Sequence, residues 1–384
     1  MFKDKIRLID IESIIKFSFA YLIVFFFKRR DVWLFSERHN EARDNGFWMF
    51  KYVRENYPFQ NAYYVIDSDS KDLDKILEYK NIIYFGTFKH YIIYLMTTKH
   101  ISAHVDADSP NSRVSNFLET HGFLKNKRVF LQHGITKDKI SFGYYNVSRA
   151  DLFVCAAKPE YDFCSKEFGY PNGNVKLLGF ARFDGLKDLS NQKKQILLMP
   201  TWRSWLANIE DKDFVKSEYY NTYQNLITNK NLISILENNN LNLVFFPHSD
   251  MQKFISLFNV KSKNIIIANS KDYDVQKLLN DSKLLITDYS SVAFDFAYLN
   301  KPVFYYHFDY EKYRKGQHPE GYYSYKKDGF GPILFSEESL LNKIELCIDN
   351  EYKNDDIYQK RVNDFFDIRD KNNCNRIYNA IKEL

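Results

Sequence analysis

The chain has 384 residues, enough for two domains, and 45% of them are hydrophobic, which excludes wholesale disorder. The net charge of +5 is a mild excess, and no basic stripe interleaves with aromatic residues, so no nucleic-acid partner is expected. The four cysteines lack metal-ligand spacing, and free thiols in a reducing cytoplasm are the simplest interpretation.

An apolar run lies near the amino terminus. Residues 14–27 read IIKFSFAYLIVFFF. As a helix this run spans about 21 Å, short of the roughly 30 Å hydrocarbon core of a bilayer. No small-residue cleavage site follows, so a signal peptide is not expected. Two interpretations remain, a buried or interfacial helix of the first domain and a helix lying in a membrane surface. We expect residues 1–30 to associate with a membrane, with basic side chains at anionic headgroups: Lys3, Lys5, Arg7, Lys28, Arg29 and Arg30.

After residue 30, short apolar runs alternate with longer amphipathic segments. This βαβ rhythm predicts an α/β protein with parallel sheets. The strands expected in the first half are 32–35, 62–66, 81–85, 100–102, 128–132 and 151–155. Those expected in the second half are 195–200, 242–247, 264–268, 283–288 and 301–306, with helices around 221–238, 273–281 and 291–299.

A polar stretch, GLKDLSNQKK at residues 185–194, predicts a linker between two doubly wound halves. Such halves would leave a cleft between them, and ligands of these sheets bind at the carboxyl ends of the strands. The domains expected are a membrane-associating segment at 1–30, Rossmann-like domains at 31–185 and 186–350, and carboxyl-terminal helices at 351–384.

Polar side chains follow four of the expected strands. His133 and Gly134 follow RVFLQ, Arg203 closes PTWR after ILLMP, and His248 follows LVFFP. Tyr289, Ser290 and Ser291 follow LLITD. Because parallel strands end at one edge of a sheet, we expect each half to present these groups to a ligand.

The stretch from Ser290 opens an expected helix. A helix start carries free N–H groups and the positive end of the dipole, which suits a phosphate, and plain N-capping is the alternative. Asp295 lies one turn after Ser291 on the same face, where a carboxylate can accept hydrogen bonds from a polyol. The sequence has no GxGxxG or Walker loop, so any nucleotide phosphates must be held in another way.

Three further residue types suit phosphoryl transfer. The unperturbed pKa of a histidine, about 6.5, suits a general base near neutral pH, which makes His133 a candidate base. Gly134, which has no side chain, lets the backbone or a ligand come close. His248 is a candidate donor to a phosphate that gains charge in the transition state. Arg203 offers a planar fork for a diphosphate. The alternatives are core or capping histidines and a surface arginine; His100, His104 and His121 are interpreted as structural.

Together these motifs resemble the CDP-glycerol glycerophosphotransferase family, the teichoic acid primases and polymerases. The resemblance covers roughly residues 31–335 in the family's order. Its motifs are DN-G after a strand and Glu37, LQHG, G-x-x-R-x-D, PTWR, PH, TDYSSVAFDF and a tail from FDYEKY to GFGP. The residues that carry them are Asp44, Asn45, Gly46, His133, Gly179, Arg182, Asp184, Arg203, His248, Thr287, Ser290, Ser291, Asp295, Asp309, Tyr313, Gly321 and Gly331.

The resemblance implies a GT-B fold and a peripheral enzyme at the cytoplasmic face of the bacterial membrane. It implies CDP-glycerol or CDP-ribitol as donor, bound by the second domain, and a lipid-linked (undecaprenyl diphosphate) saccharide or polymer as acceptor, bound by the first. No metal or further cofactor is expected, and a homo-oligomer is left open. Carried over, His133 is the base; His248, Arg203, Thr287, Ser290 and Ser291 face the donor phosphates; Asp295 faces the polyol; Gly134, Asp44 and Arg182 complete the site.

One motif departs from the family, and two other functions stay open. The family form HG-T-P-x-K reads HGITKDK here, which puts the acceptor-side lysine contact in doubt. A GT-B glycosyltransferase would share the fold but release UDP or GDP from a nucleotide sugar. A non-catalytic membrane-bound scaffold would have no reason to keep the His, Arg and Ser set together.

Overall fold

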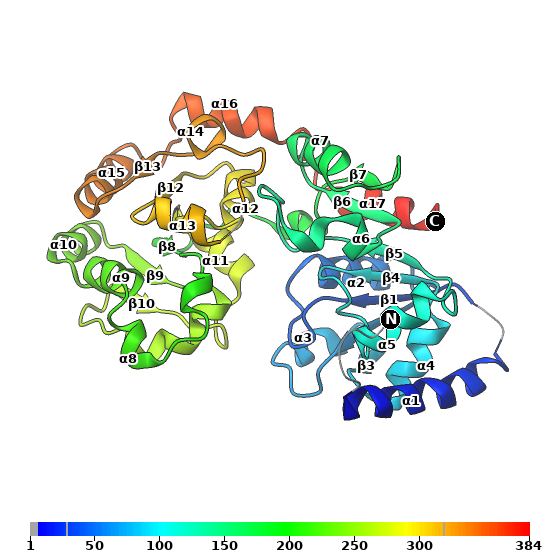
Figure 1. Ribbon diagram of the computed structural model, residues 1–384. Coiled ribbons are helices and arrows are strands. Elements are labelled where there is room, and N and C mark those ends of the chain that lie inside the picture. The colour runs from blue at the N-terminus through cyan, green and yellow to red at the C-terminus, as the bar shows by residue number, and fades with distance from the viewer. Residues whose placement is uncertain (1–6, 28–29, 318) are drawn as a thin grey trace. The chain divides into compact units, whose positions relative to one another are not determined.

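The computed structural model describes residues 7–27, 30–317 and 319–384 (Figure 1). Lys3, Lys5, Lys28 and Arg29 of the expected membrane segment lie outside these residues. The chain divides into two compact units. Unit 1 comprises the chain up to Ile135, Ser141–Gly185 and Asp370–Leu384, and unit 2 comprises Thr136–Ile140 and Leu186–Arg369.

Unit 1 is built on a parallel sheet, seven-stranded within the described residues, in the order β3-β2-β1-β4-β5-β6-β7. Helices pack on both faces, so central strands such as β1 are buried at every position. The order reverses between β1 and β4, the place where doubly wound sheets bind ligands. The strands are β1 (Val32–Ser36), β2 (Asn61–Ile66), β3 (Ile82–Tyr84), β4 (Lys99–Ser102), β5 (Lys127–Phe130), β6 (Leu152–Cys155) and β7 (Val175–Leu177). The helices are α1 (Leu8–Val24), α2 (Asn45–Asn56), α3 (Leu73–Leu77), α4 (Phe88–Met96), α5 (Ser112–Thr120), α6 (Tyr145–Ser148), α7 (Lys158–Glu167) and α17 (Asn373–Lys382), with 3-10 turns η1 (Ser141–Gly143) and η2 (Ala181–Gly185).

Unit 2 repeats this design with a parallel sheet, six-stranded in the described part of the chain, in the order β10-β9-β8-β11-β12-β13. Its order reverses between β8 and β11. The strands are β8 (Gln195–Leu198), β9 (Asn242–Phe245), β10 (Ile265–Ile267), β11 (Leu284–Thr287), β12 (Val303–Tyr306) and β13 (Ile333–Leu334). The helices are α8 (Asp211–Phe214), α9 (Glu218–Thr228), α10 (Lys230–Asn238), α11 (Val275–Asp281), α12 (Val292–Tyr298), α13 (Tyr310–Gly316), α14 (Tyr325–Asp328), α15 (Glu337–Asp349) and α16 (Asp356–Phe365), with η3 (Ser204–Leu206) and η4 (Ser249–Leu257).

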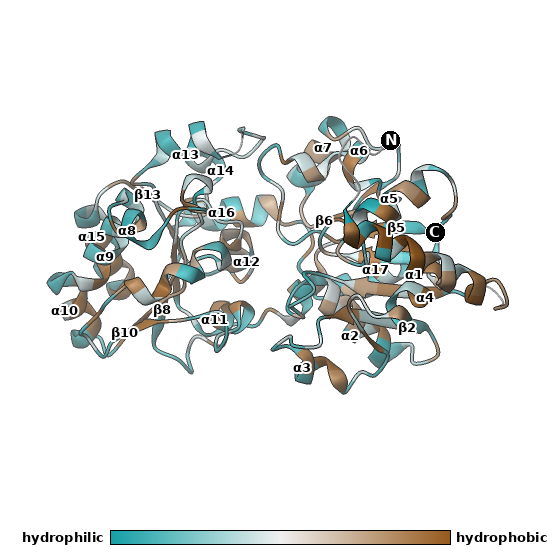
Figure 2. Ribbon diagram, turned by 60° about the horizontal axis from the view of Figure 1, so that its bottom comes forward, coloured by the Kyte–Doolittle hydropathy of each residue, from teal (hydrophilic) through white to brown (hydrophobic). Residues whose placement is uncertain are grey.

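Helix α1 docks on unit 1 along one face only. Buried Asp10 pairs with Arg113 at 3.0 Å, and Ser13 hydrogen-bonds the Tyr91 hydroxyl at 3.0 Å. Phe17 packs edge-on against Tyr91. Figure 2 shows the helix as strongly hydrophobic, and much of that surface is exposed to solvent. Among the described residues no helix is both long enough and apolar enough to cross a membrane.

The predicted α/β class with parallel sheets is confirmed, and each expected strand is present with small changes of boundary. The short strands β7 and β13 were not expected, because three and two residues carry too little pattern. The helix expected at 221–238 is two helices, since the Asn229 side chain accepts the Asn231 N–H at 2.7 Å and caps α10. The expected carboxyl-terminal helices divide, with α16 in unit 2 and α17 in unit 1.

Candidate active site

Four polar groups are tied together at the carboxyl edge of the unit 1 sheet. Asp44 caps α2 by accepting the Asn45 N–H at 2.7 Å, and the Arg182 guanidinium donates to the same carboxylate at 2.7 Å. The Asn45 side chain donates to the Gln132 carbonyl at 2.7 Å and accepts the Arg182 N–H at 3.0 Å. The predicted site residues Asp44 and Arg182 are thus brought together beside the loop that carries His133.

The glycine of the DN-G motif, Gly46, lies where the backbone of β1 leaves no room for a side chain. A side chain at Gly46 would place its Cβ 2.4 Å from the Ser36 carbonyl oxygen. The carboxyl oxygens of the buried Glu37 side chain, which lies next to Gly46, accept the N–H groups of Arg43 at 2.5 Å and Phe47 at 3.0 Å, at the positive end of α2. Burial and the neighbouring Asp44 raise the pKa of Glu37 to about 8, against the effect of these N–H groups. Glu37 therefore positions the start of α2.

The residue before His133 has a strained backbone. Gln132 has a φ of 59°, in the left-handed region that a non-glycine residue seldom adopts. It is buried, and its side chain donates to the Val154 carbonyl at 2.7 Å and to Glu160 at 3.0 Å. Such strain persists only where surrounding contacts enforce it, and it is concentrated at functional sites. The chain therefore leaves β5 in an enforced direction that presents His133.

The His133 side chain is solvent-exposed but flanked by aromatic rings. Its imidazole stacks on that of His104, with centroids 4.5 Å apart and planes at 8°, and lies 5.5 Å from the Phe142 ring. Desolvation by the crowding protein atoms lowers the pKa of His133, and the guanidinium groups of Arg38 and Arg182 add to this. The Asp44 carboxylate opposes the shift. A neutral imidazole, able to accept a proton, is thereby favoured.

The HGITKDK segment runs from unit 1 into unit 2. Lys137 is buried and forms an ion pair with Asp138, which also accepts from Arg314 at 2.8 Å. The Lys137 carbonyl lies so close to Gly321 that a Cβ there would be 2.2 Å away. This buried lysine is therefore engaged within unit 2.

Arg203 follows β8 as predicted, but its side chain is enclosed by protein atoms. It is fully buried, and its guanidinium donates to Asp309 at 2.8 and 2.9 Å and to Asp288 at 2.9 Å. Its remaining N–H groups reach the carbonyls of Thr201 at 2.8 Å and Trp202 at 3.4 Å. All five donors are therefore engaged, and a direct phosphate contact would require this network to break.

The hydroxyl cluster after β11 divides into an inner and an outer part. Thr287 is buried and donates to the Met199 carbonyl at 2.7 Å, so its hydroxyl joins β11 to β8. Ser290 and Ser291 are half-buried at the start of α12, and the Ser290 hydroxyl accepts the N–H of Val292 at 3.3 Å. Asp295 is buried within α12. Ser290 and Ser291 are thus the accessible members of the predicted set.

His248 caps the 3-10 turn η4, directly after the carboxyl end of β9. Its Nδ1 accepts the Asp250 N–H at 3.2 Å. In the neutral ring this bond assigns the hydrogen to Nε2, which makes Nε2 a donor. The imidazole is half-buried and lies nearly parallel to the Trp202 ring, with centroids 6.3 Å apart.

Two residues at these edges were missed by the sequence analysis. Asp288 accepts from Arg203 and from the Thr201 N–H at 2.8 Å, so it links the ends of β8 and β11. His104, interpreted as structural, stacks on His133. Its signal was available, because it follows an expected strand within three residues, as His133, Arg203 and His248 do.

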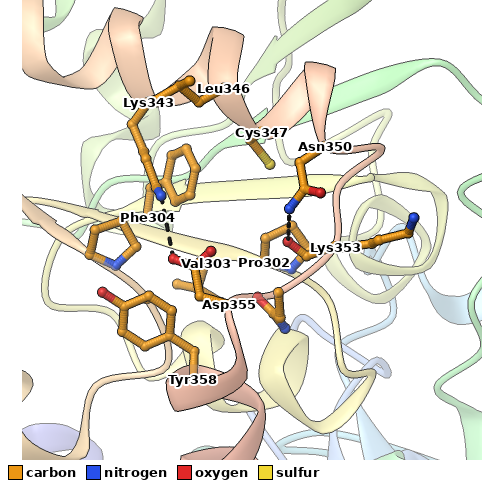
Figure 3. A pocket seen from close by; sticks show the side chains of 13 residues that line it. Pro302, Val303, Phe304, Lys343, Leu346, Cys347, Asn350, Lys353, Asp355 and Tyr358 are labelled. Atoms are coloured by element: carbon orange, nitrogen blue, oxygen red, sulfur yellow. Dashed lines mark hydrogen bonds and ion pairs between the residues drawn. The ribbon is translucent and has the colours of Figure 1, made fainter.

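A small cavity of about 30 Å³ lies at the amino-terminal ends of β12 and β13, beneath α15 (Figure 3). Lys343 and Asp355 form an ion pair of 3.4 Å across it. The cavity meets these strands at their amino-terminal ends, through Pro302, Val303 and Pro332, whereas Ser290 follows β11 at the opposite edge of the sheet, so the cavity is separate from the candidate site. No group of three or more His, Cys, Asp or Glu side chains in the described residues is placed to hold a metal ion.

Comparison with known proteins gives a consistent result. The model of the family "CDP-Glycerol:Poly(glycerophosphate) glycerophosphotransferase" matches residues 17–383. The minor teichoic acid biosynthesis protein GgaB of Bacillus subtilis is 38% identical over 395 residues, covering 100% of this chain and 43% of that protein. A teichoic acid poly(glycerol phosphate) polymerase of Bacillus spizizenii is 30% identical over 216 residues, covering 56% of this chain and 48% of that protein. The chain thus spans less than half the length of these relatives. The solved wall teichoic acid polymerase TagF shares the fold, with a TM-score of 0.72 at 18% identity over 97% of this chain and 95% of that one.

Proposed function

Because the chain belongs to the CDP-Glycerol:Poly(glycerophosphate) glycerophosphotransferase family, we propose that it transfers glycerol phosphate or ribitol phosphate from a CDP-linked donor. The acceptor is a lipid-linked saccharide or growing chain of teichoic acid or a related capsular polymer, and CMP is released. The observation that carries this proposal is His133, presented by an enforced loop at the carboxyl edge of a parallel sheet, one strand away from the reversal of strand order between β1 and β4. A TagF variant soaked with CDPG supports a CDP-linked donor.

In the proposed reaction an acceptor hydroxyl attacks the β-phosphorus of the donor. A new bond forms between the acceptor oxygen and phosphorus, the bond from phosphorus to the CMP oxygen breaks, and His133 takes the hydroxyl proton. The lowered pKa of His133 keeps the imidazole neutral near pH 7, the form a base requires. Asp44 and Arg182 are proposed to support the His133 loop through Asn45, which donates to the Gln132 carbonyl, and not to carry the proton.

We propose that unit 2 binds the CDP-linked donor. The Nε2–H of His248 and the hydroxyls of Ser290 and Ser291 are the donors proposed for the phosphate oxygens, where developing charge is stabilised by preorganised hydrogen bonds. Asp295 is proposed to face the polyol. Arg203 is proposed to act indirectly, by holding Asp288 and the loop that follows β11.

One experiment distinguishes the two CDP-linked donors from each other and from the nucleotide sugar of a glycosyltransferase. The protein is incubated with CDP-glycerol, CDP-ribitol or a UDP-sugar, each with a lipid-linked disaccharide, while CMP, UDP and the product mass are measured. CMP release with addition of one polyol phosphate supports the proposal. UDP release without CMP would establish the glycosyltransferase, and no release from any donor would favour the scaffold.

We also propose that α1 places the protein at the cytoplasmic face of the membrane. Its inner face is held by the Asp10 and Ser13 contacts, while Phe19 is 60% and Leu22 61% exposed. A helix in the membrane plane inserts such an apolar face. The triple variant Ile15→Ser/Phe19→Ser/Leu22→Ser is expected to lose flotation with anionic vesicles.

The matched control for that experiment is Leu346→Ser/Ile357→Ser, which removes exposed apolar side chains from unit 2. This control is expected to float as the wild-type protein does. A wild-type protein that ignores vesicles, or equal flotation of the α1 variant, would refute the membrane assignment and leave the transfer reaction untouched.

A further inference from the structure

His104 and His133 meet because their strands are neighbours. β4 and β5 pair in parallel with Ser102 opposite Phe130. His104 follows β4 by two residues and His133 follows β5 by three, so both leave the same edge of the sheet. Their rings lie almost parallel, at 8°, with centroids 4.5 Å apart.

The backbone of His104 is fixed by two serine hydroxyls. Ser36 donates to the Ser102 hydroxyl at 2.8 Å, and Ser102 donates to the His104 carbonyl at 2.6 Å. The His104 N–H donates back to Ser102 at 3.2 Å. The ring itself is held differently, because its Nδ1 is buried and has no hydrogen-bond partner among the described residues. Stacking on His133 is therefore a main contact of this imidazole.

The charges around the pair keep His104 neutral. Burial lowers its pKa far below the ordinary value, and His133, Arg38 and His39 add to this. The groups that act on His133 are Asp44, Arg38, Arg182 and the backbone of Ala103, whose hydrogen bond raises the His133 pKa. Since two rings in contact do not readily hold two protons, His104 presents an uncharged face whenever His133 takes one.

We propose that His104 is a positioning residue, a neutral aromatic platform that fixes the plane of the His133 imidazole and covers one face of that ring against water. This rests on the proposed role of His133 as base. Orientation of a reacting group is worth large factors in rate, and an offset of 1 Å can cost a hundredfold. The platform requires a flat ring and no hydrogen bond from Nδ1, so phenylalanine can replace it and alanine cannot.

The experiment compares His104→Ala with His104→Phe, and His121→Ala, an exposed histidine at the end of α5, is the control. His104→Ala is expected to lower the turnover for CMP release about ten- to a hundredfold. With the shield removed, the His133 pKa is expected to move up toward 6.5, and the acid limb of the pH–rate profile with it. His104→Phe is expected to retain both the turnover and the profile.

The His133 titration is also followed by NMR in the same variants, which needs no catalysis. If the His133 titration moves in His104→Ala but not in His104→Phe, the platform is established. This holds even if the wild-type protein releases no CMP, because that result would refute only the proposed function. Equal loss of turnover in both variants with an unmoved titration would overturn the platform and assign chemistry to the imidazole itself. Wild-type behaviour of His104→Ala would overturn it as well.

Discussion

The carboxyl edges of the two sheets use charged residues in different ways. In unit 1 the polar network of Asp44, Asn45 and Arg182 lies beside an exposed imidazole, His133, and Asn45 bonds the loop that carries it. In unit 2 the charged side chains of Arg203, Asp288 and Asp309 form a network that is buried. The groups left at the surface there are small hydroxyls and one imidazole, those of Ser290, Ser291 and His248.

A charged residue at a strand end therefore need not touch a ligand. Both sheets place their motifs at the carboxyl edge, yet the His133 side chain is exposed there, whereas the Arg203 side chain is buried and supports a loop. Substitutions at the first kind are expected to change rate or affinity, and at the second kind stability.

The largest effect is expected at the exposed imidazole. His133→Ala should lower the turnover for CMP release about 10²–10⁴-fold, the usual contribution of a general base, and leave donor binding nearly intact. Because the pKa of His133 is lowered, the acid limb of the wild-type profile should lie below the usual range of histidine and vanish in the variant. Near-wild-type turnover of a folded variant would leave proton transfer to His248 or to the substrate.

The buried cation of unit 2 should behave in the opposite way. Arg203→Met leaves the carboxylates of Asp288 and Asp309 buried and unpaired, which costs about 3–5 kcal/mol of stability. Denaturant unfolding followed by hydrogen exchange should show unit 2 strands losing protection while unit 1 strands keep theirs. The exposed Lys212→Met is the control, with an expected change within about 0.5 kcal/mol. Normal stability with weakened donor binding would reinstate Arg203 as a phosphate contact.

One buried histidine in each unit is expected to have the same effect on stability. His90 in unit 1 and His307 in unit 2 are buried, each bonded through Nε2 to a backbone carbonyl, and burial lowers the pKa of each to about 4. The unfolded chain binds these protons near pH 6.5, so stability is full above that pH and falls as the pH drops toward 4. The slope is at most about 1.4 kcal/mol per pH unit for each histidine.

Unfolding free energies measured between pH 7 and pH 4.5 check this slope. His90→Asn should flatten it for unit 1 strands and His307→Asn for unit 2 strands, whereas His121→Asn at an exposed position should not. Identical slopes in all four proteins would show that neither buried histidine is responsible.

The smallest effect is expected at the accessible hydroxyls. The double variant Ser290→Ala/Ser291→Ala should weaken donor binding by about 1.5–3 kcal/mol, roughly ten- to a hundredfold, because a hydrogen bond to a charged phosphate is lost. Thr287→Val is the matched control, since its hydroxyl bonds the Met199 carbonyl and should affect folding instead. Calorimetric titration with CDP-glycerol measures both, and unchanged affinity of the serine variant would remove these hydroxyls from the donor site.

Much of this protein was predictable from its sequence because the relevant signals are local. Buried parallel strands read as apolar runs whatever surrounds them, so the expected strands and the α/β class hold in the structure. The positions of His133, His248, Ser290 and Ser291 after those strands follow from the same runs. Strands β7 and β13 escaped because two or three residues carry no periodicity.

Only the tertiary structure decided what each polar side chain does there. Arg203 and His133 look alike in sequence, each following an apolar run, yet one is enclosed by Asp288 and Asp309 and the other is exposed. The carboxylate of Asp309 comes from a distant segment of the chain, and the ring of His104 from a neighbouring strand. Burial and hydrogen bonding depend on which segments meet, and a linear pattern records where a strand ends but not what faces its last residue.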